Sequence, residues 1–205
     1  MPLLCFCELI AECGSASATR QNFWSDSCIC RHYGSEKCIL FANAGTGELA
    51  PLGAITEEHF DKIFNTNVKG LLFTVQKALP LMPDGASIIL NASIVASTGN
   101  PAFSVYSATK VAVRSFARTW ILDLKERKIR VNAISPGPIN TPGLDGLAQT
   151  EGVGNELKAG LVASVPMGRL GKPDEIAKAV VFLAADDSSF VTGTELFVDG
   201  GAAQI

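Results

Sequence analysis

The sequence predicts an α/β fold in which helices cover both faces of a doubly wound parallel sheet. Short apolar runs such as "CILFAN" (38–43) and "ASIILNAS" (86–93) are typical of buried strands. Segments with the length and pattern of long helices follow each of them, at 56–80 and 103–127. Strands that alternate with helices of this length form parallel sheets, and such sheets bind ligands beyond the carboxyl ends of their strands.

Each element of the first half has a local reason to form. The first strand runs into "AGTG" (44–47), a loop of the kind that follows a buried parallel strand. We expect Thr56 to cap helix 56–80, because a threonine hydroxyl accepts a hydrogen bond from the free amides of the first turn. Glu57 and Glu58 then lie at the positive end of the helix dipole.

The second half continues the alternation. A third strand lies in "IRVNAISPGPI" (129–139) and ends in a Pro/Gly turn. A glycine-punctuated stretch at 143–155 leads into a predicted helix, and the next helix at 173–185 starts with proline, which suits a first helical turn. "TELFVDGG" (194–201) is the last predicted strand.

Composition narrows the function classes. The 205 residues are 47% hydrophobic, which suits one domain with a substantial core. The net charge of −3 and the lack of a basic stripe argue against a nucleic-acid partner. No apolar run reaches the roughly 18–20 residues that span a bilayer. The first residues lack the basic start of a secretory signal, so we expect a cytoplasmic protein.

The cysteines are unevenly placed. All six lie in the first 38 residues, at positions 5, 7, 13, 28, 30 and 38. A disulfide framework is one interpretation, but it is typical of secreted chains. Zinc binding is another, although the close pairs have Cys-x-Cys spacing and His32 is the one histidine nearby.

A set of motifs occurs from residue 39 onward: "NAG" (43–45), "NTNVKG" (65–70), "NASIVAS" (91–97), "YSATK" (106–110), "SPGPINT" (135–141), "GRLGKPDEIA" (168–177) and "FVDGG" (197–201). In their order and spacing they resemble the short-chain dehydrogenase/reductase family. Each motif alone is weak, but together they extend to the end of the chain. The resemblance implies a Rossmann-like fold and hydride transfer between a nicotinamide cofactor and a carbonyl or alcohol.

This chemistry explains the residue types. A tyrosine with its ordinary pKa near 10 is a poor base at neutral pH, and a lysine one helical turn away favours the phenolate. We therefore expect Tyr106 as the general acid/base, with Lys110 lowering its pKa. The resemblance implies that Lys110 also binds the nicotinamide ribose. Ser93 is expected to hydrogen-bond the substrate oxygen, and Asn67, by resemblance, to support a proton relay to the lysine.

The resemblance also implies a cofactor site. In addition to Tyr106 and Lys110, it assigns Asn43, Ala44, Gly45, Pro136, Gly137, Ile139 and Thr141. Ile139 is expected to contact the nicotinamide carboxamide through its backbone, and Thr141 the carboxamide or phosphates. A structural role for Asn43, bracing neighbouring strands, is an equal alternative. The cofactor is NAD or NADP, which the sequence does not distinguish, and we expect no metal at the site.

The N-terminal part departs from the family. The family begins with a strand and a glycine-rich turn, TGxxxGxG, whose amides hold the pyrophosphate, and this sequence has no such motif. We therefore divide the chain into an aberrant cysteine-rich segment at 1–38 and a short-chain dehydrogenase/reductase domain at 39–205. The abrupt change suggests a misread or frameshifted 5′ region, or a truncated copy. Without its usual neighbour, strand 38–43 would be an apolar edge, and "PLLCFC" (2–7) is a candidate partner.

The expected function is an NAD(P)-dependent oxidoreductase that interconverts a secondary alcohol and a ketone or aldehyde. The main alternative is a non-catalytic remnant that keeps only the fold and the oligomer surfaces. A third possibility is a cysteine-rich metal-binding module fused to such a remnant. By resemblance, the helix at 103–127 and the elements at 173–199 predict a homodimer or homotetramer.

Overall fold

The computed structural model describes residues 27–31, 38–145 and 154–204, and their strands form one sheet in the order β1-β2-β3-β4-β5. Strands β2 to β5 are parallel, which confirms the predicted α/β architecture. β1 pairs with β2 in the antiparallel direction. The strands are β1 Ser27–Arg31, β2 Cys38–Ala42, β3 Ser87–Asn91, β4 Arg130–Pro136 and β5 Glu195–Val198.

The edge of β2, which we expected to be apolar and open to a substitute partner, has such a partner in the structure. β1 covers that edge over five residue pairs, from Ser27 opposite Ala42 to Arg31 opposite Cys38. The candidate partner at 2–7 lies outside the described residues. Because β1 is antiparallel, its amino end rather than its carboxyl end lies at the edge where β2 ends. The described sheet is therefore parallel from β2 to β5, as predicted, with one antiparallel strand, β1, in its N-terminal part.

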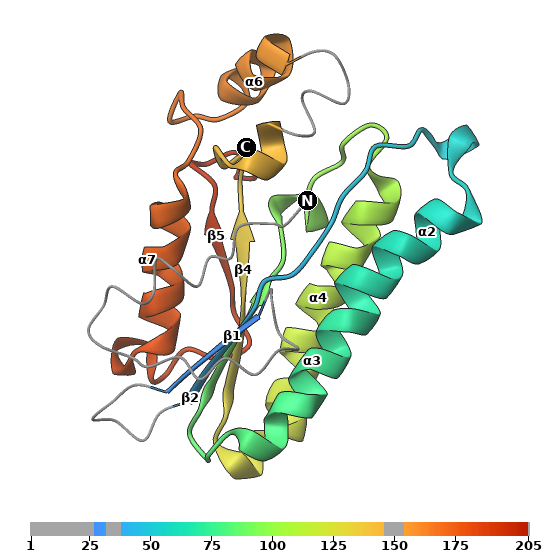
Figure 1. The fold of residues 1–205 in the computed structure, drawn as a ribbon. Coiled ribbons are helices and arrows are strands. Elements are labelled where there is room, and N and C mark those ends of the chain that lie inside the picture. Colours follow the sequence, from blue (N-terminus) through green and yellow to red (C-terminus); the bar gives the residue numbers. More distant parts are fainter. Residues whose placement is uncertain (1–26, 32–37, 146–153, 205) are drawn as a thin grey trace.

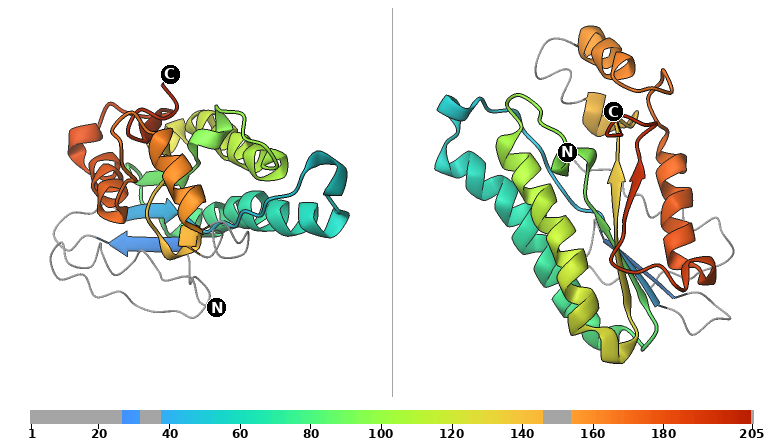
Figure 2. Two further views of the ribbon diagram at one scale, coloured as in Figure 1. Left: turned by 90° about the horizontal axis from the view of Figure 1, so that it is seen from above. Right: turned by 180° about the vertical axis from the view of Figure 1, so that it is seen from behind.

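The helices form two layers, as Figure 1 shows: α3 and α4 cover one face of the sheet, with α2 alongside α4, and α7 covers the other face. Figure 2 shows α6 beyond the carboxyl ends of β4 and β5. The described α-helices are α2 Glu57–Phe64, α3 Leu71–Ala78, α4 Ser104–Asp123, α6 Gly154–Ala163 and α7 Pro173–Ala184. A π-helical segment, Asn65–Gly70, joins α2 to α3, and short 3₁₀ turns lie at Leu52–Ala54, Leu79–Leu81, Ile94–Ala96, Lys125–Arg127 and Asp186–Ser188. None of the described helices is long and apolar enough to cross a membrane.

Alternation along the strands divides the core between the two layers. On β3, Ile88 and Leu90 pack in the cluster that includes α3 and α4 residues, whereas Ile89 packs in the cluster that includes α7 residues. All three side chains are fully buried. A strand with apolar residues on both faces belongs inside a sheet covered on both sides, as the uninterrupted apolar run predicted.

The helix predicted over 56–80 begins as expected but is not uniform. The Thr56 hydroxyl accepts a hydrogen bond from the His59 amide, which confirms the predicted cap. The π-helical segment then interrupts the α-helical hydrogen bonding. Such segments are rare and occur frequently at functional sites. Here the segment carries Asn67, whose side chain is buried.

Two polar side chains of β4 fix the strand to its neighbours. The Asn132 side chain, fully buried, donates to the Val191 carbonyl and accepts from the Thr194 amide. The Arg130 guanidinium donates to the Leu183 carbonyl near the C-terminus of α7, where a cation also complements the helix dipole. These bonds hold β4 against β5 and α7, and so fix the edge at which β4 ends.

Candidate active site

The carboxyl ends of the parallel strands bring the predicted residues together. Asn43 follows β2, Ser93 follows β3, and Pro136 is the last residue of β4. Parallel strands end at one edge of the sheet, so these positions share that edge. Tyr106 and Lys110 reach the same edge from the first turns of α4.

Lys110 is the most enclosed charge of the site. Its side chain is only 3% exposed, and Nζ donates to the Asn91 carbonyl at the end of β3 over 2.8 Å. The same Nζ lies 5.5 Å from the centroid of the Tyr106 ring. Burial lowers the pKa of Lys110 from 10.5 to about 8, because the ammonium form loses its hydration.

Tyr106 does not have the lowered pKa that the sequence predicted. Burial raises the pKa of Tyr106 above its ordinary value of 10.0, and a hydrogen bond with the Ser93 side chain opposes the rise. The expected net lowering of this pKa is not found, because desolvation of the phenol outweighs the groups that favour the phenolate. Tyr106 is therefore a neutral phenol at pH 7.

Asn67 connects the site internally. Its Oδ1 accepts from the Thr46 amide, and its Nδ2 donates to the Thr46 carbonyl, each over 2.8 Å. Nδ2 also donates to Thr109 Oγ1 over 3.0 Å, and that hydroxyl donates to the Tyr106 carbonyl over 2.6 Å. One carboxamide thus joins the loop after β2 to the helix that carries Tyr106 and Lys110.

Two functional positions escaped the sequence analysis. Thr109 lies inside "YSATK", and its spacing from Tyr106 on a helix would have placed it on a neighbouring face. Gly47 lies in "AGTG", and a Cβ at this position would come within 3.1 Å of Tyr106 Cδ2. A side chain larger than glycine would therefore press on the tyrosine ring. The second glycine of the loop is the signal that could have indicated this close approach.

The other residues of the loop after β2 lie near the same groups. A Cβ on Gly45 would lie 3.4 Å from both Lys110 Nζ and Asn67 Oδ1, so the missing side chain leaves room beside the lysine. Ala44 is partly buried in the same loop. Asn43 Oδ1 accepts from Asn91 Nδ2 over 2.7 Å, which links the ends of β2 and β3. This bond supports the bracing role that was one of the two alternatives for Asn43.

The loop after β4 is tightly constrained at Gly137. A Cβ there would lie 2.6 Å from the Asp199 Cα, and the Gly137 amide donates to the Val198 carbonyl. Farther along, the Pro138 carbonyl and the Asn140 amide bond to Gly171, and Ile139 forms a parallel bridge with that residue. In such a bridge the backbone groups of Ile139 itself point to the other side.

Thr141 ends this loop by capping the next helical residues. Its hydroxyl accepts from the Leu144 amide over 3.3 Å, and its carbonyl accepts from the Asp145 amide. The predicted contact of Thr141 with a cofactor stays a prediction, because the structure contains no ligand.

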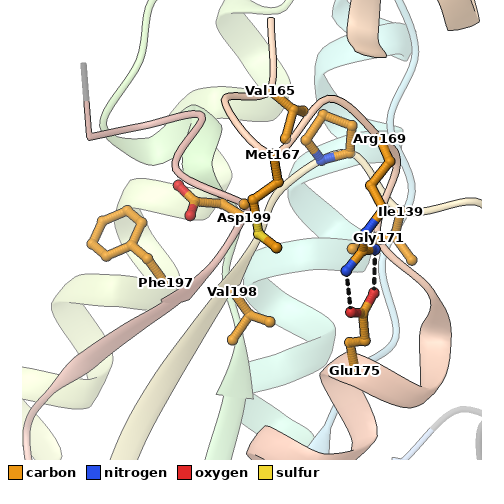
Figure 3. Close-up of a pocket in the computed structure, with 11 residues that line it drawn as sticks. Ile139, Val165, Met167, Arg169, Gly171, Glu175, Phe197, Val198 and Asp199 are labelled. Atoms are coloured by element: carbon orange, nitrogen blue, oxygen red, sulfur yellow. Dashed lines mark hydrogen bonds and ion pairs between the residues drawn. The ribbon is translucent and has the colours of Figure 1, made fainter.

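A pocket lies beside the loop that carries Ile139 (Figure 3). Figure 3 shows Ile139, Met167 and Val198 on its walls beside the bidentate pair of Arg169 and Glu175. Neither Tyr106, Lys110 nor Ser93 lines it. We place the chemistry at the Tyr106 cluster and not in this pocket, because the groups that can transfer a proton lie there.

The residues fit half of a dinucleotide site. The space beside Gly45, the ammonium of Lys110 and the outward-facing backbone of Ile139 suit the nicotinamide riboside half of the cofactor. The pyrophosphate half has no such match in the described ranges, since β1 brings its amino end to this edge and leads into no glycine-rich turn there. Within the same ranges no three His, Cys, Asp or Glu side chains gather as a metal site would. Cys5, Cys7 and Cys13 lie outside them.

Comparison with known proteins decides the family. A family model described as enoyl-(acyl carrier protein) reductase matches residues 34–203. Oxidoreductase asL5 of Sarocladium schorii is 45% identical over 169 residues, which make up 82% of this chain and 66% of that protein. The chain belongs to the short-chain dehydrogenase/reductase family.

Solved structures agree with this membership. The angucycline C-6 ketoreductase LanV with bound NADP superposes with a TM-score of 0.76 at 31% identity, over 82% of this chain and 63% of that one. A short-chain dehydrogenase family protein from Francisella tularensis gives a TM-score of 0.75 at 29% identity, over 80% of this chain and 70% of that one. The chain thus spans about two thirds of the length of the relatives it matches, for example 66% of asL5.

Because the ammonium of Lys110 is buried, we expect it to lower the free energy of unfolding. Between pH 8 and 10.5 the unfolded chain binds the Lys110 proton more tightly than the folded chain, so stability rises with pH over this window and the full cost is present below pH 8. We expect Lys110→Met to raise the free energy of unfolding at pH 7 by up to about 3 kcal/mol, less the value of the bond to Asn91. The gain should vanish by pH 10.5. Urea unfolding at pH 7 and at pH 10.5 measures both.

Lys178→Met is the matched control for this prediction. Lys178 is exposed on α7, and its ion pair with Asp174 raises rather than lowers the pKa of the lysine. The control should therefore show no gain in stability at pH 7. A Lys110→Met protein that is less stable than the wild type at pH 7 would contradict the prediction.

Proposed function

We propose that the chain is an NAD(P)-dependent oxidoreductase that interconverts a carbonyl and a secondary alcohol, with Asn67, Ser93, Tyr106 and Lys110 as its catalytic residues. The observation that carries the proposal is the buried ammonium of Lys110, which lies 5.5 Å from the centroid of the Tyr106 ring at the edge of the sheet where Ser93 follows β3. A neutral phenol and a serine hydroxyl together can direct two donors at one substrate oxygen. The family membership supports this assignment.

The proton steps follow from the geometry. In carbonyl reduction, the cofactor would supply the hydride to the carbonyl carbon. Tyr106 would donate its phenolic proton to the oxygen, and Ser93 would stabilise the negative charge that develops on it. The phenolate left on Tyr106 is favoured by the ammonium of Lys110, which lies over the ring.

A raised pKa keeps Tyr106 protonated at pH 7, so the resting residue can begin carbonyl reduction as the proton donor. The reverse oxidation begins from the phenolate, which burial disfavours and the ammonium of Lys110 favours. The relative LanV is named a ketoreductase, which agrees with carbonyl reduction.

The nicotinamide half of the cofactor would bind to residues that flank the catalytic groups. Lys110 would donate to the ribose hydroxyls with the ammonium protons that Asn91 does not accept. The backbone of Ile139 would bind the carboxamide, and Thr141 would contact the carboxamide or phosphates. We propose NAD or NADP without distinguishing them. The relative LanV was solved with NADP.

One observation favours the alternative, a remnant of such an enzyme with impaired cofactor binding. The antiparallel β1 occupies the edge of β2 where a parallel strand and its glycine-rich turn would hold the pyrophosphate. Both candidates keep the same proposed catalytic residues. The two candidates therefore differ in the affinity for the dinucleotide, which a titration measures directly.

The first test of the proposed function concerns Tyr106. Tyr106→Phe removes the proton donor but keeps the ring, so we expect reduction of a ketone by NADPH or NADH to fall by about 10²–10⁴-fold with an unchanged circular dichroism spectrum. Tyr33→Phe, at the second of the two tyrosines, is the matched control and should keep its activity. Near-normal turnover of a folded Tyr106→Phe protein would contradict the assignment of Tyr106 as the proton donor.

The second test concerns affinity. We expect calorimetric titration with NADPH or NADH to give a dissociation constant at least about tenfold weaker than that of an intact family member, since each lost 1.4 kcal/mol is a factor of ten. Exchanging residues 1–38 for the first strands and glycine-rich turn of a family member should tighten binding. Tight binding by the unaltered chain would mean that its own N-terminal segment supplies a phosphate site, and the prediction would be wrong.

The third test concerns self-association through α4 and α7. Val111 and Leu122 are 49% and 68% exposed on α4, and Phe182 is 42% exposed on α7. Apolar side chains at these positions suit the dimer or tetramer expected of the family. Sedimentation should give a mass above the 21.6 kDa of one chain, and Leu122→Glu should lower it. A wild-type protein that sediments only as a monomer contradicts this.

A further inference from the structure

Three polar side chains from three elements meet in the interior beside the catalytic helix. Arg114 Nε, on α4, donates to Glu195 Oε2, on β5, over 3.0 Å. Ser135 Oγ, on β4, donates to the other oxygen of the same carboxylate over 2.7 Å. The side chains of Arg114 and Glu195 are 15% and 13% exposed, and Ser135 is fully buried. None of the three belongs to the set that the sequence predicted for catalysis or cofactor binding.

Stability alone does not account for this network. Removing two charges from water costs several kcal/mol for each ion, and apolar residues of similar volume often serve the fold as well or better. Arg114 adds to the cost, because its buried Nη1 has no hydrogen-bond partner in the described part of the chain. A directional role is the reason that remains for an ion pair at this place.

The position of Arg114 on α4 indicates what this directional role is. Tyr106, Lys110 and Arg114 follow one another at intervals of four residues, so they form one stripe along α4. Lys110 bonds to the end of β3, and Arg114 bonds to the start of β5. Since β3 and β5 lie on either side of β4, the two bonds hold the helix across that strand. Apolar contacts would fix the rotation of α4 and its position along its axis less sharply, because they are not directional.

The other end of the network lies at the loop that begins after β4. Ser135 immediately precedes Pro136 and Gly137, where this loop starts toward Ile139. Glu195 is thus bonded both to the helix that carries the proton donor and to the strand that leads into the proposed carboxamide site. The Glu195 carboxylate thus connects, through the interior, the helix that carries the proton donor with the loop proposed to bind the carboxamide.

We propose that Arg114, Glu195 and Ser135 form a positioning network, which sets where Tyr106 and Lys110 lie relative to the loop after β4. The proposal rests on the proposed function for the roles of Tyr106 and Lys110. None of the three side chains reaches the reacting atoms, so they act through the placement of the helix and the loop.

The chain offers a direct readout, since it contains only two tyrosines, Tyr33 and Tyr106. Protein labelled with 3-fluorotyrosine should give two ¹⁹F resonances, and Tyr106→Phe assigns them. The test variant is Arg114→Met with Glu195→Leu, which replaces the charges by apolar groups of similar length. We expect its melting temperature to equal or exceed that of the wild type. We expect the Tyr106 resonance to move or split, because the helix loses its anchor two turns away.

Two further variants make the test decisive. Lys178→Met with Asp174→Asn removes an exposed ion pair on α7 and should leave the Tyr106 resonance in place. Ser135→Ala removes one bond to Glu195 and should move the Tyr106 resonance by less than the double variant does. A folded double variant with an unmoved Tyr106 resonance overturns the proposal. If the double variant does not fold, an unmoved resonance in Ser135→Ala overturns it instead.

These spectra need neither cofactor nor substrate. An unchanged Tyr106 resonance therefore counts against the network alone. Absence of carbonyl reduction by the wild type counts against the proposed function alone.

Discussion

The geometry of the site depends on the buried carboxamide of Asn67. It bonds to both backbone groups of Thr46 and to the hydroxyl of Thr109, and so joins the loop after β2 to the catalytic helix. A buried amide with its groups paired specifies one arrangement, because any shift would leave a polar atom unsatisfied. The π-helical segment is the local consequence, since it turns Asn67 inward from a helix that would otherwise continue past the site.

The sequence predicted those features that local chemistry determines. The cap at Thr56 and the proline at the start of α7 depend on neighbouring residues in the chain, and both occur as expected. The π-helical segment was not predictable in this way, because it depends on partners 21 and 42 residues distant from Asn67. The direction of β1 was equally hidden, since strand pairing uses backbone groups that every sequence has. The pKa of Tyr106 depends on burial in the folded chain, which spacing along a helix does not reveal.

The site combines groups that we expect the fold to be more stable without. Lys110 loses hydration for one hydrogen bond to a carbonyl, and a buried nitrogen of Arg114 has no hydrogen-bond partner among the described residues. Both residues lie on the stripe of α4 that begins at Tyr106. Polar groups of this kind are retained where position or charge matters more than stability. Val113 and Ala117 lie on the same face of α4 and pack in the core beneath the sheet, so this face serves both the chemistry and the packing.

The antiparallel pairing of β1 with β2 has a consequence for the order of folding. Arg31 pairs with Cys38 across a short connection, whereas Ile39 of β2 pairs with Ser87 of β3, 48 residues later. Closing a short loop costs less entropy and is faster than forming a long-range parallel pair. We therefore expect the β1–β2 hairpin to form before α2 and α3 bring β3 into place. Another strand that reached this edge of β2 after the hairpin had formed would have to open it before pairing.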